Sequence, residues 1–202
     1  WDPSEWKSVH RENSPWYKAY GDGSYIVDAF DMAKAADPDA ELYYNDYSIC
    51  DSGKRDRVVK MINELDLKSH GLTGVGIQAH WSIAWPPISS IQETIDVFHK
   101  MGLDVQITEL DINCYDNDKS SVTRAYGNFE NTLAKRYEEI FKLFRRNKDK
   151  ITNVTFWGVA DDHTWLDTFY GDGEQKKARK NYPFLFDAKH KKKKAYSSVN
   201  DF

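Results

Sequence analysis

The feature that most constrains the fold is an alternation of short strand-type runs with longer helical runs. Apolar residues recur at helical spacing in four segments, 25–36, 54–68, 89–101 and 122–147. Four runs of β-type composition lie among them, at 41–48, 74–82, 104–112 and 151–159. Strands that alternate with helices pair in parallel through crossover connections. We therefore predict an α/β fold with a parallel sheet and a closing helical segment at 185–200.

Four parallel strands are compatible with a small open doubly wound sheet or with half of an eight-stranded barrel. No Gly-rich phosphate loop follows any of the four runs, and each run places its polar and aromatic residues toward its carboxyl end. Active sites of (β/α)8 barrels lie at that end of the strands. We predict a half-barrel, and because four strands cannot close a barrel, the missing half must come from elsewhere.

Composition narrows the class of ligand. The 202 residues carry a net charge of −4, which leaves no electrostatic footprint for nucleic acid, and no apolar run approaches the roughly 20 residues of a membrane span. The basic run Lys189–Lys194 is interpreted as a solvated helix face. Aromatic residues make up 14% of the chain, and because aromatic faces stack on sugar rings, this composition favours a carbohydrate ligand.

Two carboxylates interrupt the third strand-type run. Because side chains alternate along a strand, we expect Ile107, Glu109 and Asp111 to share a face that points into the barrel. An ionised carboxylate there is costly unless it is hydrogen-bonded, paired or functional. Gln78 and His80 repeat the two-residue spacing on the preceding run, so we expect them to face the same space.

Two indoles complete the candidate pocket. Trp157 ends the fourth run and Trp165 follows in its loop, although core packing explains each of them equally well. Carboxylates, an imidazole, an amide and indoles together suit stabilisation of an oxocarbenium-like sugar transition state. The competing interpretation is a divalent-metal site with ligands from His80, Glu109, Asp111 and His163. That interpretation lacks any tight ligand spacing such as His-Glu-x-x-His.

Six segments carry a family resemblance. In chain order they read SPWY (14–17), ADPDAELYYNDYS (36–48), GVGIQAHW (74–81), VQITELDI (105–112), VTFWGVADDHTWL (154–166) and YPFLFD (182–187). The series resembles the successive blocks of glycoside hydrolase family 10, the endo-1,4-β-xylanases. ITELDI is the most specific block, and the ordered series covers nearly the whole chain.

The resemblance implies a (β/α)8 TIM barrel. Residues 1–202 would form the C-terminal half of the catalytic domain, roughly its last four β/α units, with 1–24 as an irregular leading segment after strand four. It also implies retaining hydrolysis of internal β-1,4-xylosidic bonds of xylan, without a cofactor. By position, Glu109 would be the nucleophile, with His80 and Asp111 around it. The substrate contacts would come from Asn45, Tyr47, Gln78, Trp157 and Trp165.

One part of the family pattern is missing. The acid/base carboxylate of the family lies in a Trp-Asp-Val-Val-Asn-Glu block before SPWY, whereas here Trp1-Asp2 is followed by Pro3-Ser4-Glu5-Trp6. Glu5 and Glu12 are poor substitutes because they lie in a polar loop. We therefore expect the N-terminal half of the same domain as a partner, in an arrangement that also accommodates an inserted carbohydrate-binding module. The family further implies a secreted, cell-surface or periplasmic bacterial protein.

Two other functions stay open. A non-catalytic xylan-binding protein would keep the cleft and lack the acid/base residue, so the sequence upstream of Trp1 distinguishes it from the enzyme. A divalent-metal enzyme on the same barrel predicts activity that a chelator abolishes.

Overall fold

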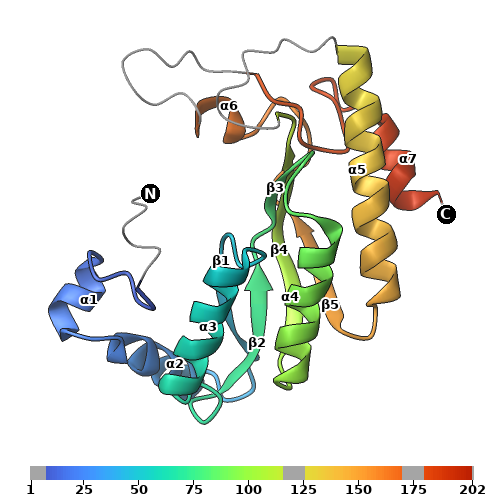
Figure 1. Ribbon diagram of the computed structural model, residues 1–202. Helices are drawn as coiled ribbons and strands as arrows, with labels where there is room; N and C mark the ends of the chain where they lie inside the picture. The colour runs from blue at the N-terminus through green and yellow to red at the C-terminus, as the bar shows by residue number, and fades with distance from the viewer. Residues whose placement is uncertain (1–7, 116–125, 170–179, 202) are drawn as a thin grey trace.

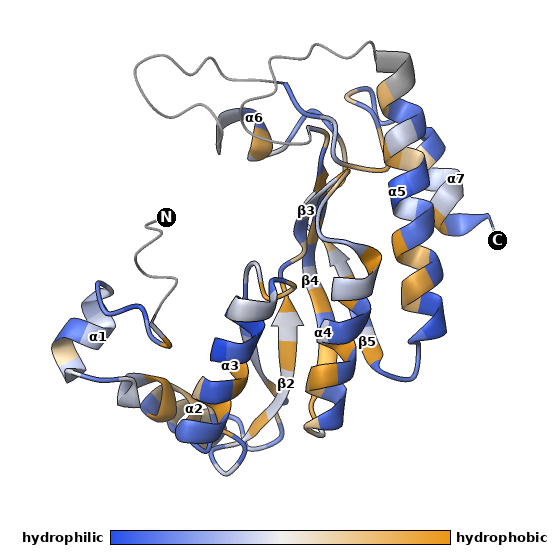
Figure 2. Cartoon of the chain, in the orientation of Figure 1, coloured by the Kyte–Doolittle hydropathy of each residue, from blue (hydrophilic) through white to orange (hydrophobic). Residues whose placement is uncertain are grey.

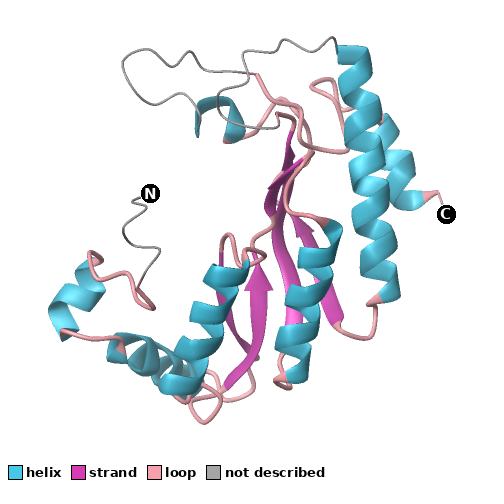
Figure 3. Ribbon diagram, viewed as in Figure 1, coloured by secondary structure: helices cyan, strands magenta, loops and turns pink. Residues whose placement is uncertain are grey.

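A parallel β-sheet is the scaffold of the chain in the computed structural model, which describes residues 8–115, 126–169 and 180–201 (Figures 1 and 3). The strand order is β1-β2-β4-β3, and β5 pairs with β4 on the side away from β2. The strands are β1 (Leu42–Asp46), β2 (Leu72–Ile77), β3 (His80–Ser82), β4 (Asp104–Asn113) and β5 (Ile151–Phe156). All their pairings are parallel, as the βα alternation predicts.

Helices precede β1, follow β5 and connect the other strands, except for β2 and β3, which only residues 78–79 separate. They are α1 (Pro15–Tyr20), α2 (Ser24–Ala36), α3 (Ser52–Glu64), α4 (Ile88–Lys100), α5 (Tyr126–Arg146), α6 (Leu166–Phe169) and α7 (Lys194–Asn200). Local signals begin some of them: the Asp51 side chain accepts the Lys54 N–H at 2.9 Å and so caps α3. None of the described helices is long and apolar enough to cross a membrane.

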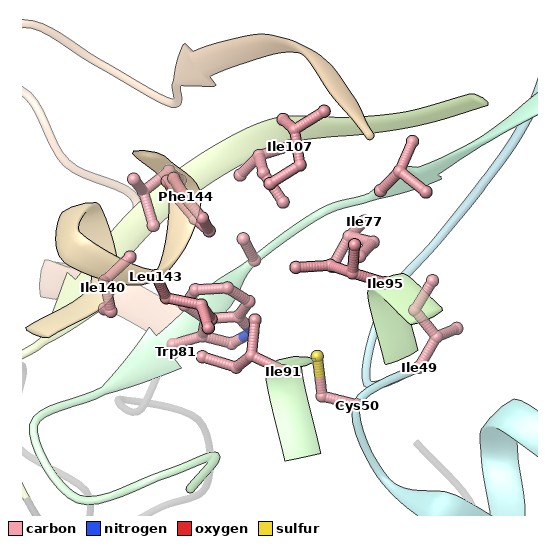
Figure 4. Packing of buried hydrophobic residues seen from close by; sticks show 14 of the residues in the cluster. Ile49, Cys50, Ile77, Trp81, Ile91, Ile95, Ile107, Ile140, Leu143 and Phe144 are labelled. Atoms are coloured by element: carbon pink, nitrogen blue, oxygen red, sulfur yellow. The ribbon is translucent and has the colours of Figure 1, made fainter. Parts of the chain in front are cut away.

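The hydrophobic core lies on one side of the sheet. Val75, Ile77, Val105 and Ile107 are at most 1% exposed and belong to one cluster with the apolar sides of α3, α4 and α5. Figure 4 shows Ile77 and Ile107 near Ile91 and Ile95, and Figure 2 shows apolar residues along β2 and β4. The alternate strand residues, such as Asn45, Gln106 and Thr108, are polar and partly or fully exposed. A sheet covered by helices on one face is the arrangement of a barrel wall and not of a doubly wound sheet.

The predicted single strand over 74–82 is wrong: β2 and β3 are separate strands. Ala79 adopts a φ of 60°, and this left-handed residue breaks the extended backbone between them. β2 pairs with the first half of β4 and β3 with its last residues, so both run beside the same neighbour.

The prediction that 1–24 is irregular is also wrong for its described part. Ser14 caps α1 by accepting the Tyr17 N–H at 3.1 Å, Pro15 occupies the first turn, and Gly21 ends the helix at a φ of 82°.

The basic run is not a solvated helix face throughout. Residues 189–193 are not helical, α7 begins at Lys194, and the Lys193 side chain is only 3% exposed. The predicted closing helical segment 185–200 is wrong in its first half, because α7 covers only Lys194–Asn200. The other predicted elements agree with the structure to within a few residues at their ends, although 122–125 of the predicted long helix lie outside the described residues.

Candidate active site

The chemistry-bearing residues gather near the carboxyl ends of β1, β2, β4 and β5, with His80 at the start of the short strand β3 that follows β2. Parallel strands present these ends at one edge of the sheet, so residues far apart in sequence meet there. The contributing residues are Asn45 of β1, His80 of β3, Glu109 and Asp111 of β4, Trp157 directly after β5 and Trp165 directly before α6. The sequence predicts this grouping, and the structure brings these six side chains into one set of contacts.

Glu109 is held through both of its carboxylate oxygens. The Asn45 amide nitrogen Nδ2 donates to Oε1 at 2.9 Å, and His80 Nε2 lies 3.1 Å from Oε2. The Glu109 side chain keeps 14% of its surface exposed, so it is fixed in direction and still accessible to solvent. A carboxylate held in this way presents a defined oxygen to a substrate.

Asp111 supports the network from behind His80. Its side chain is fully buried, and its Oδ1 lies 3.1 Å from His80 Nδ1. Its other oxygen, Oδ2, accepts the indole N–H of Trp165 at 2.7 Å. Trp165, Asp111, His80 and Glu109 therefore form a continuous hydrogen-bonded chain that pays the desolvation cost of the buried carboxylate.

The charge state of His80 follows from its two partners. Both ring nitrogens face carboxylate oxygens, and only the protonated imidazolium donates from both nitrogens at once. Burial by itself lowers the pKa of His80, but the hydrogen bonds and negative charges of Asp111 and Glu109 outweigh burial and raise the pKa above its usual value. The two carboxylate partners therefore favour the protonated form of His80.

Aromatic side chains flank the imidazole. The ring of Trp165 lies edge-on to His80, with centroids 4.9 Å apart, and that of Trp157 lies at 6.3 Å. Trp157 is half exposed and Tyr47 is 38% exposed, with the Lys54 ammonium 4.8 Å above the Tyr47 ring. The aromatic faces of Trp157 and Trp165 beside His80 are suited to a sugar ring.

Two predicted substrate residues stand apart from the network. Gln78 lies between β2 and β3, is half-buried, and donates its backbone N–H to the Asp46 carbonyl at 3.2 Å. Among the described hydrogen bonds, those of the Glu109 network do not include the side chains of Gln78 or Tyr47.

The prediction that Ile107 shares an inward face of β4 with Glu109 and Asp111 is wrong for Ile107. Ile107 is fully buried in the core, whereas Gln106 and Thr108 are only partly buried. The pairing of β4 with β5 shifts register between Ile107 and Leu110, and this irregularity lets Glu109 and Thr108, neighbours in sequence, both contact Asn45.

Sequence reasoning missed Thr108 altogether and expected Asn45 only as a cleft residue. The Thr108 hydroxyl donates to the Asn45 carbonyl oxygen Oδ1 at 2.6 Å. The available signal was the polar character of Asn45 and Thr108 on strands whose alternate residues are apolar.

The described residues offer neither a metal-binding cluster nor a second carboxylate in the Glu109 network apart from Asp111. In the described ranges, no group of three or more His, Cys, Asp or Glu side chains is arranged to hold a metal ion. Glu12 is exposed and accepts the Ser8 hydroxyl at 2.8 Å, while Glu5 lies outside the described residues.

Comparison with known proteins agrees with the geometry. The sequence pattern of Glycosyl hydrolase family 10 matches residues 2–202. An endo-1,4-beta-xylanase of Geobacillus stearothermophilus is 40% identical over 97% of this chain and 57% of its own length, and a beta-1,4-xylanase of Dictyoglomus thermophilum is 39% identical over 94% and 53%. The chain therefore spans about half the length of these curated relatives.

A solved structure shares the fold. A GH10 endoxylanase from a sugarcane soil metagenome superposes with a TM-score of 0.82 at 38% identity, and the match covers 94% of this chain and 56% of that protein. The parallel sheet with helices on one face is thus part of the family's (β/α)8 barrel. Together, the family match and the relatives show that the chain belongs to glycosyl hydrolase family 10.

Proposed function

We propose that this chain is the C-terminal half of the catalytic barrel of a retaining endo-1,4-β-xylanase, with Glu109 as its nucleophile. The observation that carries the proposal is the fixation of both Glu109 oxygens, by Asn45 and by His80, at the carboxyl end of a barrel strand. The names of the relatives, xylanases at 39% and 40% identity, support xylan as the substrate.

The proposed reaction has two displacements. In the first, a Glu109 oxygen forms a bond to the anomeric carbon as the bond to the leaving xylose oxygen breaks, and a carboxylic acid on the other side of the cleft protonates that oxygen. In the second displacement, the acid/base group that protonated the leaving oxygen is now a carboxylate, and it removes a proton from water. The water oxygen then bonds to the anomeric carbon and releases Glu109 as a carboxylate.

The network around Glu109 matches these charge changes. The negative charge on Glu109 disappears when the glycosyl-enzyme forms and returns when it is hydrolysed. His80 and Asn45 donate to the charged carboxylate, and Asp111 keeps His80 oriented, so the nucleophile is ready for both steps without reorganisation.

The exposed aromatic residues define the substrate subsites in this proposal. Trp157 and Trp165 form a hydrophobic wall beside the nucleophile, which disfavours a sugar with a hydroxymethyl group. Gln78 contacts the sugar at the cleavage site, and Tyr47 and Asn45 line the leaving-group side.

We assign the acid/base carboxyl to the N-terminal half of the same barrel. A retaining glycosidase needs a second carboxyl about 5–5.5 Å from the nucleophile. The coverage of about half of each relative supports a partner half, in which an inserted carbohydrate-binding module is compatible with the chain order. Because xylan is a polymer too large to enter a cell, we place the enzyme outside the cytoplasm, secreted or at the cell surface or periplasm.

Substitution of Glu109 tests the proposal in the protein that contains both halves. Glu109→Gln keeps the shape and the contact with His80 but cannot attack carbon, so turnover of xylan should fall by about 10⁴-fold or more while xylan binding persists. The control is Glu64→Gln, which alters an exposed carboxylate that forms an ion pair with Lys60 on the surface of α3 and should keep normal turnover.

Steady-state hydrolysis of xylan and a separate binding measurement distinguish the outcomes. Near-normal turnover of Glu109→Gln removes Glu109 from the nucleophile role. Tight xylan binding without hydrolysis by the unmodified two-half protein would identify a glycan-binding protein instead of an enzyme.

A further inference from the structure

Two side chains from strands that are not neighbours meet across β2. Asn45 of β1 is in register with Gly76 of β2, and Gly76 is in register with Gln106 of β4. Thr108 lies two residues further along β4, yet its hydroxyl reaches the Asn45 oxygen Oδ1 at 2.6 Å. At Gly76, the strand between them therefore leaves room for the two side chains to meet.

The two side chains can meet there because Gly76 has no side chain. A Cβ atom there would lie 2.5 Å from Asn45 Oδ1 and 2.9 Å from Thr108 Cγ2, closer than real Cβ contacts. Gly76 is not among the glycines with a positive φ, so its backbone conformation suits any residue. Space, and not backbone freedom, is what requires glycine at this position.

The contact across β2 also orients the Asn45 amide. The Thr108 hydroxyl donates to Oδ1, so the amide nitrogen Nδ2 is turned toward Glu109 Oε1, which accepts from it at 2.9 Å. An ionised carboxylate only accepts hydrogen bonds, so the opposite amide orientation would set two acceptors against each other. Thr108 and the Gly76 gap thereby fix one side of Glu109, and His80 fixes the other.

We propose that Gly76 and Thr108 are positioning residues: the missing side chain at Gly76 lets Thr108 and Asn45 form a bridge across β2 that aims Glu109. The catalytic consequence rests on the proposed function, which takes Glu109 as the nucleophile. The bridge itself is a structural statement that does not depend on that function.

The first test compares two glycines on the same strand, in the protein that contains both halves of the barrel. Gly76→Ala should push the Asn45 amide away and misplace Glu109, lowering kcat for xylan by about 10²-fold while KM stays within about twofold. Gly74→Ala is the matched control. A Cβ at Gly74 would lie 2.3 Å from Tyr43 Cε1 and 2.8 Å from the Asp104 carbonyl oxygen, so this site is at least as crowded as Gly76, but its contacts include neither Asn45 nor Thr108.

Equal kcat values for the two alanine variants would overturn the proposal, because general destabilisation of β2 would then explain both. Lower thermal stability in both variants with a kcat loss confined to Gly76→Ala supports it. This split between stability and kcat is not expected from a residue with a merely structural role.

A second test avoids crowding altogether. Thr108→Val keeps the size of the side chain but removes the hydroxyl, so the side-chain amide ¹⁵N and ¹H resonances of Asn45 should shift and kcat should fall by about tenfold. Thr108→Ser restores the hydroxyl and should return both readouts toward the unmodified protein.

The resonance readout separates this inference from the proposed function. Unchanged Asn45 amide resonances in both Thr108→Val and Gly76→Ala would overturn the bridge, whatever the enzyme does to xylan. Shifted resonances in a protein that does not hydrolyse xylan even when unmodified would reject the proposed function and leave the bridge standing.

Discussion

His80 holds together two carboxylates that would otherwise repel each other. Glu109 and Asp111 each place an oxygen 3.1 Å from one of its ring nitrogens. A neutral imidazole would leave one of these contacts without a proton, whereas the imidazolium satisfies both and offsets one negative charge. The three residues therefore form a single hydrogen-bonded unit.

The pH dependence of His80 follows from this unit. Since its pKa is raised in the folded protein, the stabilisation from its cation is fully present below the unfolded value of about 6.5 and is lost as the pH rises through the higher folded pKa. ¹⁵N NMR titration of the imidazole should show protonation above that unfolded value. Asp111→Asn removes the strongest of the interactions that raise the pKa, so His80 should then titrate at lower pH. An unchanged or higher titration midpoint in Asp111→Asn would contradict this account.

Sequence reasoning reached the residues of the site but not all of their contacts. Glu109, His80 and Asp111 were predictable because charged groups on a buried strand need partners. The Thr108–Asn45 contact was not predictable, because it depends on a register shift in β4 and on two strands meeting across a third. Strict alternation of side chains assumes a regular strand, and β4 is irregular between Ile107 and Leu110.

At the scale of elements, a buried ion pair joins the C-terminal segment to the loop after β5. Lys193 Nζ lies 2.7 Å from Asp161 Oδ2, and both side chains are almost fully buried. Lys193 also donates to the Tyr182 carbonyl at 2.9 Å, and Asp161 accepts the Phe184 N–H at 3.0 Å. The loop that follows Asp161 carries Trp165, so this pair anchors one wall of the candidate site.

The sequence does not show which lysine of this run is buried, because Lys191, Lys192 and Lys194 have the same side chain as Lys193. The structure separates them by backbone geometry. Asp187 accepts the N–H groups of Lys189 and Lys191, and His190 adopts a φ of 58°, so a tight turn precedes the extended residue Lys193. The turn, and not a helix, decides which lysine points inward.

Removing Lys193 should be far more costly than removing an adjacent lysine. Lys193→Met leaves the buried Asp161 carboxyl without its cation, so the free energy of unfolding should fall by roughly 3–5 kcal/mol. Lys191→Met removes an exposed charge and should change it by less than about 0.5 kcal/mol. Urea unfolding of both variants checks the difference.

A double variant separates the buried charge from the lost packing. Lys193→Met with Asp161→Leu removes both charges and should recover much of the stability. If the double variant is less stable than Lys193→Met alone, the ion pair is not the reason for the loss.

At the scale of the whole molecule, the two faces of the sheet differ in their side chains and in their cover by helices. Helices α3, α4 and α5 supply the core on one face, whereas the other face carries the polar side chains of Asn45, Gln106 and Thr108. Among the described strands, β1 pairs only with β2, and β5 pairs only with β4, so each has one edge without a strand partner. The half-barrel was predictable from the number and order of strand-type runs, because closure of a barrel needs eight strands.

Unpaired edges carry open backbone donors and acceptors, which favour pairing with further strands. In the proposed function, the N-terminal half of the barrel would supply strands for both edges and the carboxyl group that completes the reaction. We therefore expect xylan hydrolysis only when both halves are present, and hydrogen exchange at the backbone amides of β1 and β5 should slow when the N-terminal half is added. Amides in the centre of β4, which already has partners on both sides, provide the internal control. Hydrolysis of xylan by residues 1–202 alone at the rate of the two-half protein would contradict the proposal, because Glu109 would then have its acid/base partner within this chain.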